Sequence, residues 1–280
     1  MQSTQDSNRL LWNAWAELHA QSEFYNVAGF RAGGLSLRAI EREEIGGEVA
    51  GKRLLHLMCH FGLDTLSWAR LGAQVTGVDL SDRAIAIARA LSQELNLPAE
   101  FVQADVLSLP QALTGQFDIV YTSYGILHWI SDLPRWAAVV AQFVKPGGFF
   151  YMVEDHPFMR VFSSTETSDI VADNPYFFDP EPHRFEAQGS YAAPEVDPSL
   201  PVQTGYMWDH SLSELFNALI GAGLRLEWFH EHRKHVRAKF PGMQPRADGW
   251  YEFSERYRNS VPLLMSLKAS QPERAARSAE

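Results

Sequence analysis

The sequence is poor in cysteine, in basic residues and in long hydrophobic runs, and each deficit excludes a class of protein. One cysteine, Cys59, cannot form an internal disulfide, which fits a reducing compartment. Lys and Arg number 24 against 34 Asp and Glu, and the net charge of −10 argues against nucleic acid as a partner. No apolar run approaches the roughly 20 residues of a membrane helix, and residues 1–9 lack the apolar stretch of a signal peptide. A cytoplasmic protein with no membrane partner is expected.

What the sequence does contain is a regular alternation of strand-like and helix-like segments. Its 280 residues are 46% hydrophobic and 21% charged, which allows a sizeable core. Apolar runs predict strands at 53–58, 74–79, 100–104, 117–122 and 149–154, then at 224–231 and 261–268. Helical periods lie between them at 63–71, 82–95, 133–143 and 212–221. This alternation predicts a doubly wound α/β fold with a parallel sheet and helices on both faces.

The alternation stops after the fifth predicted strand. Residues 155–210 hold seven of the 15 prolines, nine aromatic residues, ten acidic residues and two arginines, for a net charge of −8. A long irregular segment of this kind predicts a lid or binding insertion. The expected organisation is a helical cap (1–50), a cofactor-binding core (51–154), an aromatic, acidic lid insertion (155–210), the remainder of the core (211–269) and a disordered tail (270–280).

Residues suited to ligand binding follow the first two predicted strands. The first strand runs into HLMCHFG (56–62), where Gly62 would let a ligand approach free N–H groups at the start of the next helix. The second strand ends at Asp79, beside Leu80, and an acid there can accept hydrogen bonds from both hydroxyls of a ribose.

Two further strand ends reach the same edge of the predicted sheet. Asp105 and Val106 follow the third strand, and a carboxylate there can accept a hydrogen bond from the exocyclic amine of an adenine. The fourth strand leads into SYGILH, which contains Tyr124 and ends at His128. Because open α/β sheets bind ligands at the carboxyl ends of their strands, these residues are expected to share one site.

With these motifs, the chain resembles the class I S-adenosylmethionine-dependent methyltransferases from residue 52 to 154, and more loosely to 268. The stretches that carry the resemblance are LLHLMCHFGLDTLSWARLGAQVTGVDLS, AEFVQADVLSLP, FDIVYTSYGILHWISDL and VKPGGFFYMVEDHP. It implies S-adenosylmethionine as the cofactor and a seven-stranded sheet in the order 3-2-1-4-5-7-6, with the last strand antiparallel. The cofactor-binding residues are then expected to be His56, Met58, Cys59, Gly62, Asp79, Leu80, Asp105, Val106 and Tyr124.

One loop departs from the family pattern. The glycine-rich loop of the family usually begins with an acid and continues with three alternating glycines. Here His56 takes the acidic position, Met58 and His60 take the first two glycine positions, and Gly62 alone matches. The usual acid receives the ammonium group of the cofactor, so a backbone carbonyl is expected to replace it. Cys59 is expected to pack as a small residue under the cofactor.

Methyl transfer needs a general base only where the acceptor must lose a proton. Glu154 and His156, after the fifth strand, are predicted to face the cleft and rank above His128 as candidates, since His128 could be a packed histidine. Tyr25 could be a lid residue or a packing residue. The acids and aromatics of the insertion favour a neutral or cationic small-molecule acceptor, although a solvated surface loop explains them equally well.

Two other hypotheses stay open. A nicotinamide-dependent oxidoreductase would also use Asp79 on a ribose, but G-x-G-x-x-G is missing after the first strand. A non-catalytic cofactor-binding protein would explain the altered loop as a degraded one. No metal is expected, because Cys59 and His60 lack partners at zinc-ligand spacings. The sequence does not indicate an oligomeric state.

Overall fold

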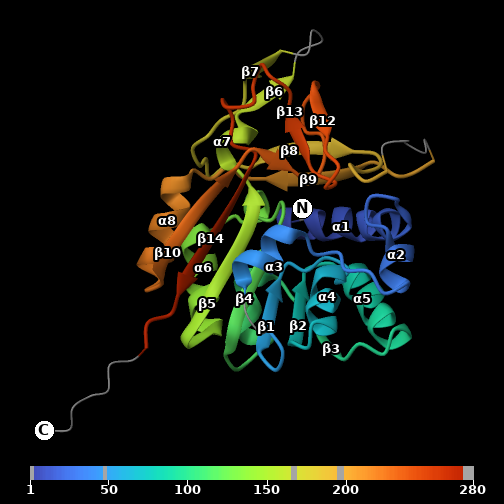
Figure 1. Cartoon of the computed structure of the whole chain (residues 1–280), viewed down its shortest axis with the longest axis vertical. Helices are drawn as coiled ribbons and strands as arrows, with labels where there is room; N and C mark the ends of the chain where they lie inside the picture. Colours follow the sequence, from blue (N-terminus) through green and yellow to red (C-terminus); the bar gives the residue numbers. More distant parts are fainter. Residues whose placement is uncertain (1–2, 47–48, 165–168, 194–198, 274–280) are drawn as a thin grey trace, which may run out of the picture.

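The computed structural model describes residues 3–46, 49–164, 169–193 and 199–273. Its main sheet has seven strands in the order β10-β14-β5-β4-β1-β2-β3 (Figure 1). The strands are β1 (Arg53–Leu57), β2 (Gln74–Asp79), β3 (Ala99–Gln103), β4 (Phe117–Ser123), β5 (Val144–Asp155), β10 (Arg225–His232) and β14 (Leu264–Ser270). Strands β1 to β5 are parallel, whereas β14 is antiparallel to β5 and β10. The predicted fold class, strand order and antiparallel last strand are confirmed.

Helices cover both faces of this sheet because its strands alternate their side chains between two apolar cores. On one face Leu55 and Val120 pack with Trp136 and Leu215, from α6 and α8. On the other face Leu54 packs with residues from α3 and α4. The helices of the core are α3 (Ala39–Ile45), α4 (Leu63–Arg70), α5 (Asp82–Glu94), α6 (Leu133–Phe143) and α8 (Leu212–Gly221), with short 3-10 turns η1 (Val106–Gln111) and η2 (Leu127–Trp129).

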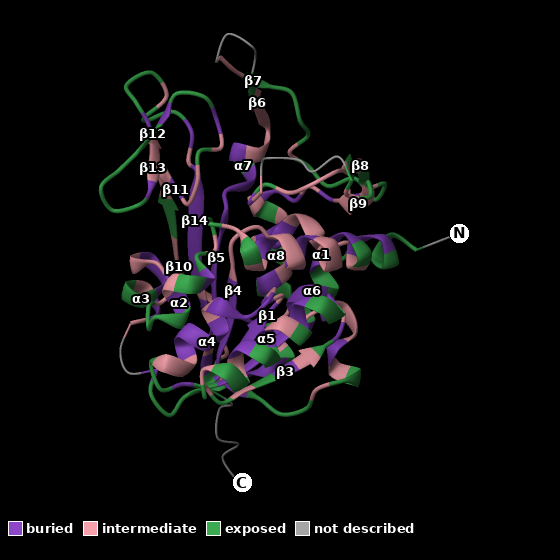
Figure 2. Cartoon of the chain, turned by 90° about the vertical axis from the view of Figure 1, so that its right-hand side faces the viewer, coloured by how far each residue is buried: buried purple, intermediate pink, exposed green. Residues whose placement is uncertain are grey.

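Above the carboxyl ends of the strands lies a second layer, which we call the cap (Figure 1). It is defined as α1, α2, residues 156–209 and residues 233–262. Its elements are α1 (Thr4–Gln21), α2 (Val27–Arg31), α7 (Pro157–Arg160), β6 (Phe162–Ser164), β7 (Ile170–Ala172), β8 (His183–Ala187), β9 (Gln203–Met207), β11 (Lys234–His235), β12 (Met243–Pro245) and β13 (Tyr251–Phe253). Figure 2 shows the central strands buried, while β6, β7 and β8 are intermediate or exposed.

The cap differs from expectation in two respects. The insertion contains two antiparallel hairpins, β6–β7 and β8–β9, where no regular structure was predicted. Part of the segment expected in the core, β11 to β13, forms a separate three-stranded sheet. That small sheet packs Phe240, Met243 and Phe253 against Met159 of the insertion. The cap is therefore assembled from three separate parts of the chain.

Helix α1 is tied to the insertion by side chains that bond to backbone. Asn8 donates its amide to the carbonyl of Tyr206, 2.9 Å away, and accepts the N–H of Tyr206 at 2.8 Å. The indole of Trp15 donates to the carbonyl of Gly189 at 2.8 Å. Asn8 thus bonds both backbone groups of Tyr206 on the edge of β9, as a residue of a neighbouring strand would. Across the described part of the chain, no helix is long and apolar enough to cross a bilayer.

Candidate functional site

A cavity of about 1250 Å³ lies between the carboxyl ends of the strands and the cap. All the residues expected to bind the cofactor line it, namely His56, Met58, Cys59, Gly62, Asp79, Leu80, Asp105, Val106 and Tyr124. His128 lines the same cavity, from η2. The strand-end rule therefore brings residues from four strand ends into one site.

The loop after β1 has the backbone of a glycine-rich loop with side chains attached. Met58 and His60 have φ angles of 58° and 51°, in the left-handed region, and Gly62 has a φ of 79°. Non-glycine residues in this region cost about 1–2 kcal/mol each. At Gly62 a Cβ would lie 2.7 Å from the ring of Phe101, so only glycine fits there. Met58 and His60 thus adopt backbone angles that favour glycine, at the two positions where the resemblance implies glycines.

Asp79 closes this loop from the end of β2. Its carboxylate accepts the backbone N–H of His60 at 2.7 Å and that of Ser81 at 2.8 Å. Burial raises the pKa of Asp79 to about 6, against these hydrogen bonds. Asp105, at the end of β3, caps η1 by accepting the N–H of Leu107 at 3.1 Å. Both carboxylates are therefore fixed in orientation and line the cavity.

His56 cannot supply the charge of the acid that the family pattern has at its position. Its Nδ1 lies 2.9 Å from the hydroxyl of Thr65, and its Nε2 lies 3.3 Å from that of Ser123. Burial lowers the pKa of His56 to about 3, so the ring is neutral at pH 7. Both ring nitrogens are satisfied when Thr65 donates to Nδ1 and Nε2–H donates to Ser123.

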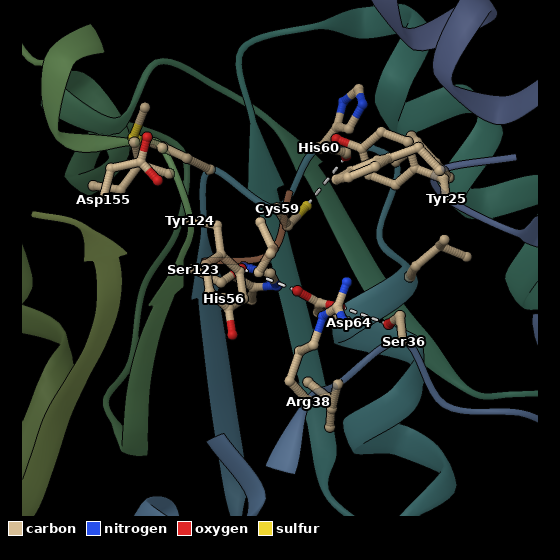
Figure 3. Close-up of a pocket in the computed structure, with 18 of the residues that line it drawn as sticks. Tyr25, Ser36, Arg38, His56, Cys59, His60, Asp64, Ser123, Tyr124 and Asp155 are labelled. Atoms are coloured by element: carbon tan, nitrogen blue, oxygen red, sulfur yellow. Dashed lines mark hydrogen bonds between the residues drawn. The ribbon is translucent and has the colours of Figure 1, made fainter. Parts of the chain in front are cut away.

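An acid that does line the cavity beside His56 is Asp64, in the first turn of α4. Its carboxylate accepts the hydroxyl of Ser36 at 2.6 Å and that of Ser123 at 3.1 Å. Figure 3 shows Asp64 between these serines, with His56 and Arg38 beside it. Burial raises the pKa of Asp64 above its usual value. The hydrogen bonds from the two serines and the charge of Arg38 offset only part of that increase. Nothing in the sequence singles out Asp64 as a site residue, because an acid in a first helical turn is commonly explained by the helix dipole.

The predicted position of Glu154 and His156 in the cleft is wrong. Glu154 is fully buried, and its carboxylate accepts the backbone N–H groups of Gly125, Ile126 and Leu127 at 2.6–3.2 Å. His156 caps α7 by accepting the N–H of Phe158, and it does not line the cavity.

Asp155 lies between these two residues in the sequence and points the other way, into the cavity (Figure 3). Side chains alternate across a strand, so a single residue decides which carboxylate faces the site. Asp155 accepts hydrogen bonds from Lys239 at 2.6 Å and His235 at 2.8 Å. Burial raises its pKa, but the charges of these two partners outweigh burial and hold the pKa well below its usual range.

Aromatic rings from the cap form the wall opposite the strand ends. The hydroxyl groups of Tyr25 and Tyr191 lie 2.6 Å apart, which joins the loop after α1 to the insertion. The Nδ1 atom of His19, in α1, lies 2.8 Å from the Nε2 atom of His60. Tyr25 thus lines the cavity and also packs in a core. The other aromatic rings that line the cavity from the N-terminal and cap segments include Trp12, Trp15, Phe24, Phe30, Phe185 and Trp250, and Trp129 joins them from η2.

Comparison with known sequences finds similarity in the core of the chain. A family profile described as a methyltransferase domain matches residues 54–148. The ubiquinone biosynthesis O-methyltransferase of Bordetella avium is 33% identical over 109 residues, which cover 39% of this chain and 45% of that protein. The protein of the same name from Aromatoleum aromaticum is 37% identical over 100 residues, which cover 36% and 42% of the two chains. The matches thus span less than half the length of these relatives.

Comparison with solved structures agrees on the fold. An S-adenosylmethionine-dependent methyltransferase from Mesorhizobium loti superposes with a TM-score of 0.54 at 23% identity, over 81% of this chain and 94% of that one. Another from Clostridium acetobutylicum gives a TM-score of 0.52 at 13% identity, over 79% and 84%. At these identities the likeness shows a shared fold over most of the chain.

Proposed function

Residues 54–148 belong to the methyltransferase domain family, and on that premise we propose that the protein transfers a methyl group from S-adenosylmethionine to a small-molecule acceptor. The observation that carries the proposal is the loop after β1. It holds the left-handed backbone of a glycine-rich loop at Met58 and His60 and is closed by Asp79. This conformation is strained for side chains, so its retention supports a working cofactor site over a degraded one.

The residues present fit the cofactor at both ends. Asp79 and Asp105 would accept hydrogen bonds from the ribose hydroxyls and the adenine amine. Asp64 would receive the ammonium group in place of the missing acid, and Arg38 beside it would pair with the carboxylate. A backbone carbonyl, as expected from the sequence, is then not needed for the ammonium contact.

The cofactor would supply an activated methyl group, and the chain would supply position and a dry environment. The aromatic rings of the cap wall would limit the access of water to the space above the strand ends once both ligands are bound. For an acceptor that must lose a proton, His128 is the proposed base. Burial, with the charge of Arg160 second, keeps its pKa well below 6.5, and its Nδ1 has no hydrogen-bond partner within the described ranges. It is therefore neutral at pH 7, and the acceptor would have to reach this buried ring for His128 to take its proton.

Calorimetry with S-adenosylhomocysteine and with NAD tests the proposal. We expect the protein to bind S-adenosylhomocysteine only. Asp79→Asn should weaken that binding about tenfold or more, since it removes charge-assisted hydrogen bonds. Asp179→Asn, an exposed aspartate outside the cavity, is the matched control and should bind normally. Binding of NAD alone would favour the oxidoreductase hypothesis, and binding of neither ligand would overturn the proposal.

A further inference from the structure

The part of the cap wall nearest Asp155 carries basic side chains, and we propose that it binds the acceptor through a carboxylate group on that acceptor. Arg160, Arg237 and Lys239 all line the cavity there. This inference rests on the proposed methyl transfer and specifies the class of acceptor. It concerns a part of the site that lies outside the segment matched by the methyltransferase profile.

The positive charge of this wall is only partly balanced by the protein. Asp155 is shared between Lys239 and His235. Arg160 approaches Asp209 only at 3.7 Å, and Asp209 also lies 3.0 Å from His183 and does not line the cavity.

Arg237 is the basic residue left over. None of the described carboxylates lies within ion-pair distance of its guanidinium group, which sits 5.0 Å from the centre of the Tyr191 ring. A cation–π contact of this kind uses none of the N–H donors of the planar guanidinium in hydrogen bonds. Such a group is suited to pair with a carboxylate through two parallel hydrogen bonds.

The basic groups also repel one another. Burial lowers the pKa of Lys239, and the charges of Arg237 and Arg160 lower it further, against the effect of Asp155. Partly buried like charges at short range are costly in a medium of low dielectric constant, and a bound anion relieves that cost. The side chains of Arg160 and Lys239 are only 25% and 17% exposed, so solvent screens them weakly.

The rest of the acceptor is defined by the rings around this wall. Trp15 from α1 and Phe185 and Tyr191 from the insertion line the cavity, and they offer flat apolar surfaces. The acceptor inferred from both features is an aromatic or otherwise flat apolar molecule that carries a carboxylate.

This differs from the neutral or cationic acceptor suggested by the composition of the insertion. The insertion has a net charge of −8, but of its described acids only Asp155 lines the cavity. The others lie on the outer surface of the cap or pair with neighbours. The total charge of a segment therefore misrepresents the charge that its ligand meets.

The test uses the fluorescence of the tryptophans that line the cavity, in full-length protein saturated with S-adenosylhomocysteine. Benzoate, benzamide, benzylamine and phenyl phosphate are titrated as probes that share one ring. We expect benzoate to bind most tightly, about tenfold or more above benzamide. Arg237→Gln should remove this preference and Arg237→Lys should keep part of it. Arg256→Gln, a cap arginine paired with Asp169 outside the cavity, should leave it unchanged.

Several results would overturn the inference while leaving the cofactor site intact. These are equal or tighter binding of benzamide, benzylamine or phenyl phosphate, no binding of benzoate, or an unchanged preference in a folded Arg237→Gln protein. A loss of S-adenosylhomocysteine binding in Arg237→Gln would assign the arginine to the cofactor and would also overturn it. If the wild-type protein itself fails to bind S-adenosylhomocysteine, the proposed function fails first.

Discussion

The strand-end wall of the cavity and the cap wall differ in charge and in how they are built. The strand-end wall presents Asp64, Asp79 and Asp105, each held by hydrogen bonds from nearby hydroxyl or backbone groups. The cap wall presents Arg237 and Lys239, which come from a segment of two- and three-residue strands. One wall is set by the regular sheet, whereas the other depends on side-chain pairs between segments distant in sequence.

This difference predicts that the two walls can be altered separately. Substitutions at the strand ends should change fold stability or cofactor affinity, because the sheet positions those residues. Substitutions in the cap should change the binding of the carboxylate-bearing ligand, and at the Lys239–Asp155 pair also fold stability, but not cofactor affinity. A strand-end variant with altered binding of the carboxylate-bearing ligand, or a cap variant with altered cofactor affinity, would show that the two walls act as one unit.

The largest effect is expected from Glu154→Gln, which lies under the strand-end wall. The carboxylate accepts four backbone N–H groups, including that of Asp155 at 2.7 Å, and an amide would turn its own donors toward some of them. We expect a loss of about 3 kcal/mol in the free energy of unfolding. Urea denaturation measures it. Glu186→Gln, at an exposed ion pair with Arg184, should change stability by less than about 0.5 kcal/mol. An equally small change in Glu154→Gln would contradict the structure.

The next effect concerns the cap. Lys239→Met leaves Asp155 with His235 as its remaining partner, and we expect a loss of about 2–3 kcal/mol at pH 7. Because the folded pKa of Asp155 lies below its unfolded value, the pair stabilises the fold above about pH 4. The stabilisation is lost as the pH falls through the folded pKa. The difference between variant and wild type in urea should therefore shrink in acid.

Lys145→Met is the matched control for that variant. Lys145 pairs with Asp118 at the surface, where its side chain is 45% exposed, and such pairs contribute less than about 1 kcal/mol. A deficit in Lys239→Met that stays constant down to pH 3 would show that lost packing, and not the ion pair, causes it.

A smaller effect tests directly whether the two walls bind different ligands. Asp64→Asn keeps the size of the side chain and can keep its bonds to Ser36 and Ser123, but it removes the charge. We expect the dissociation constant for S-adenosylhomocysteine to rise about tenfold and that for benzoate to stay the same. Arg237→Gln should show the opposite pattern. An unchanged cofactor affinity in Asp64→Asn would return the ammonium contact to a backbone carbonyl.

The smallest effect is expected from the loop after β1. In a Met58→Gly, His60→Gly double variant, relief of the left-handed backbone would gain about 1–2 kcal/mol per residue. The loss of the contact between His60 and His19 and of packing on Trp12 opposes that gain. Net stability should change by no more than about 1 kcal/mol, and cofactor affinity should not improve. Tighter cofactor binding in calorimetry would identify the natural loop as degraded.

The sequence predicted those parts of the molecule that repeat a regular pattern. The α/β fold class followed from the alternation of elements, the strand order followed from the family resemblance, and Asp79 and Asp105 followed from their places after strands. The choice between Glu154 and Asp155 could not be made, because it depends on which side of β5 faces the cavity. That side is fixed by the pairing of Asp155 with Leu264 of β14, more than a hundred residues later.

The cap was harder to predict for a different reason. Strands of two or three residues, such as β11 and β13, are too short to show a period. The bond between Asn8 and the backbone of Tyr206 joins positions that no local pattern connects. Arg237 lies in a segment rich in basic residues, 233–246, that shows no regular period, and only the fold brings it beside Tyr191.

His60 belongs to both layers of the molecule at once. Its backbone N–H is held by Asp79, while its ring contacts His19 of α1. A shift of this loop would therefore be felt by α1, whose residues Trp12 and Trp15 line the same cavity. Any coupling that this contact creates between the two ligands would be reciprocal, by thermodynamic linkage. A glycine at position 60, having no side chain, could not make this contact with α1.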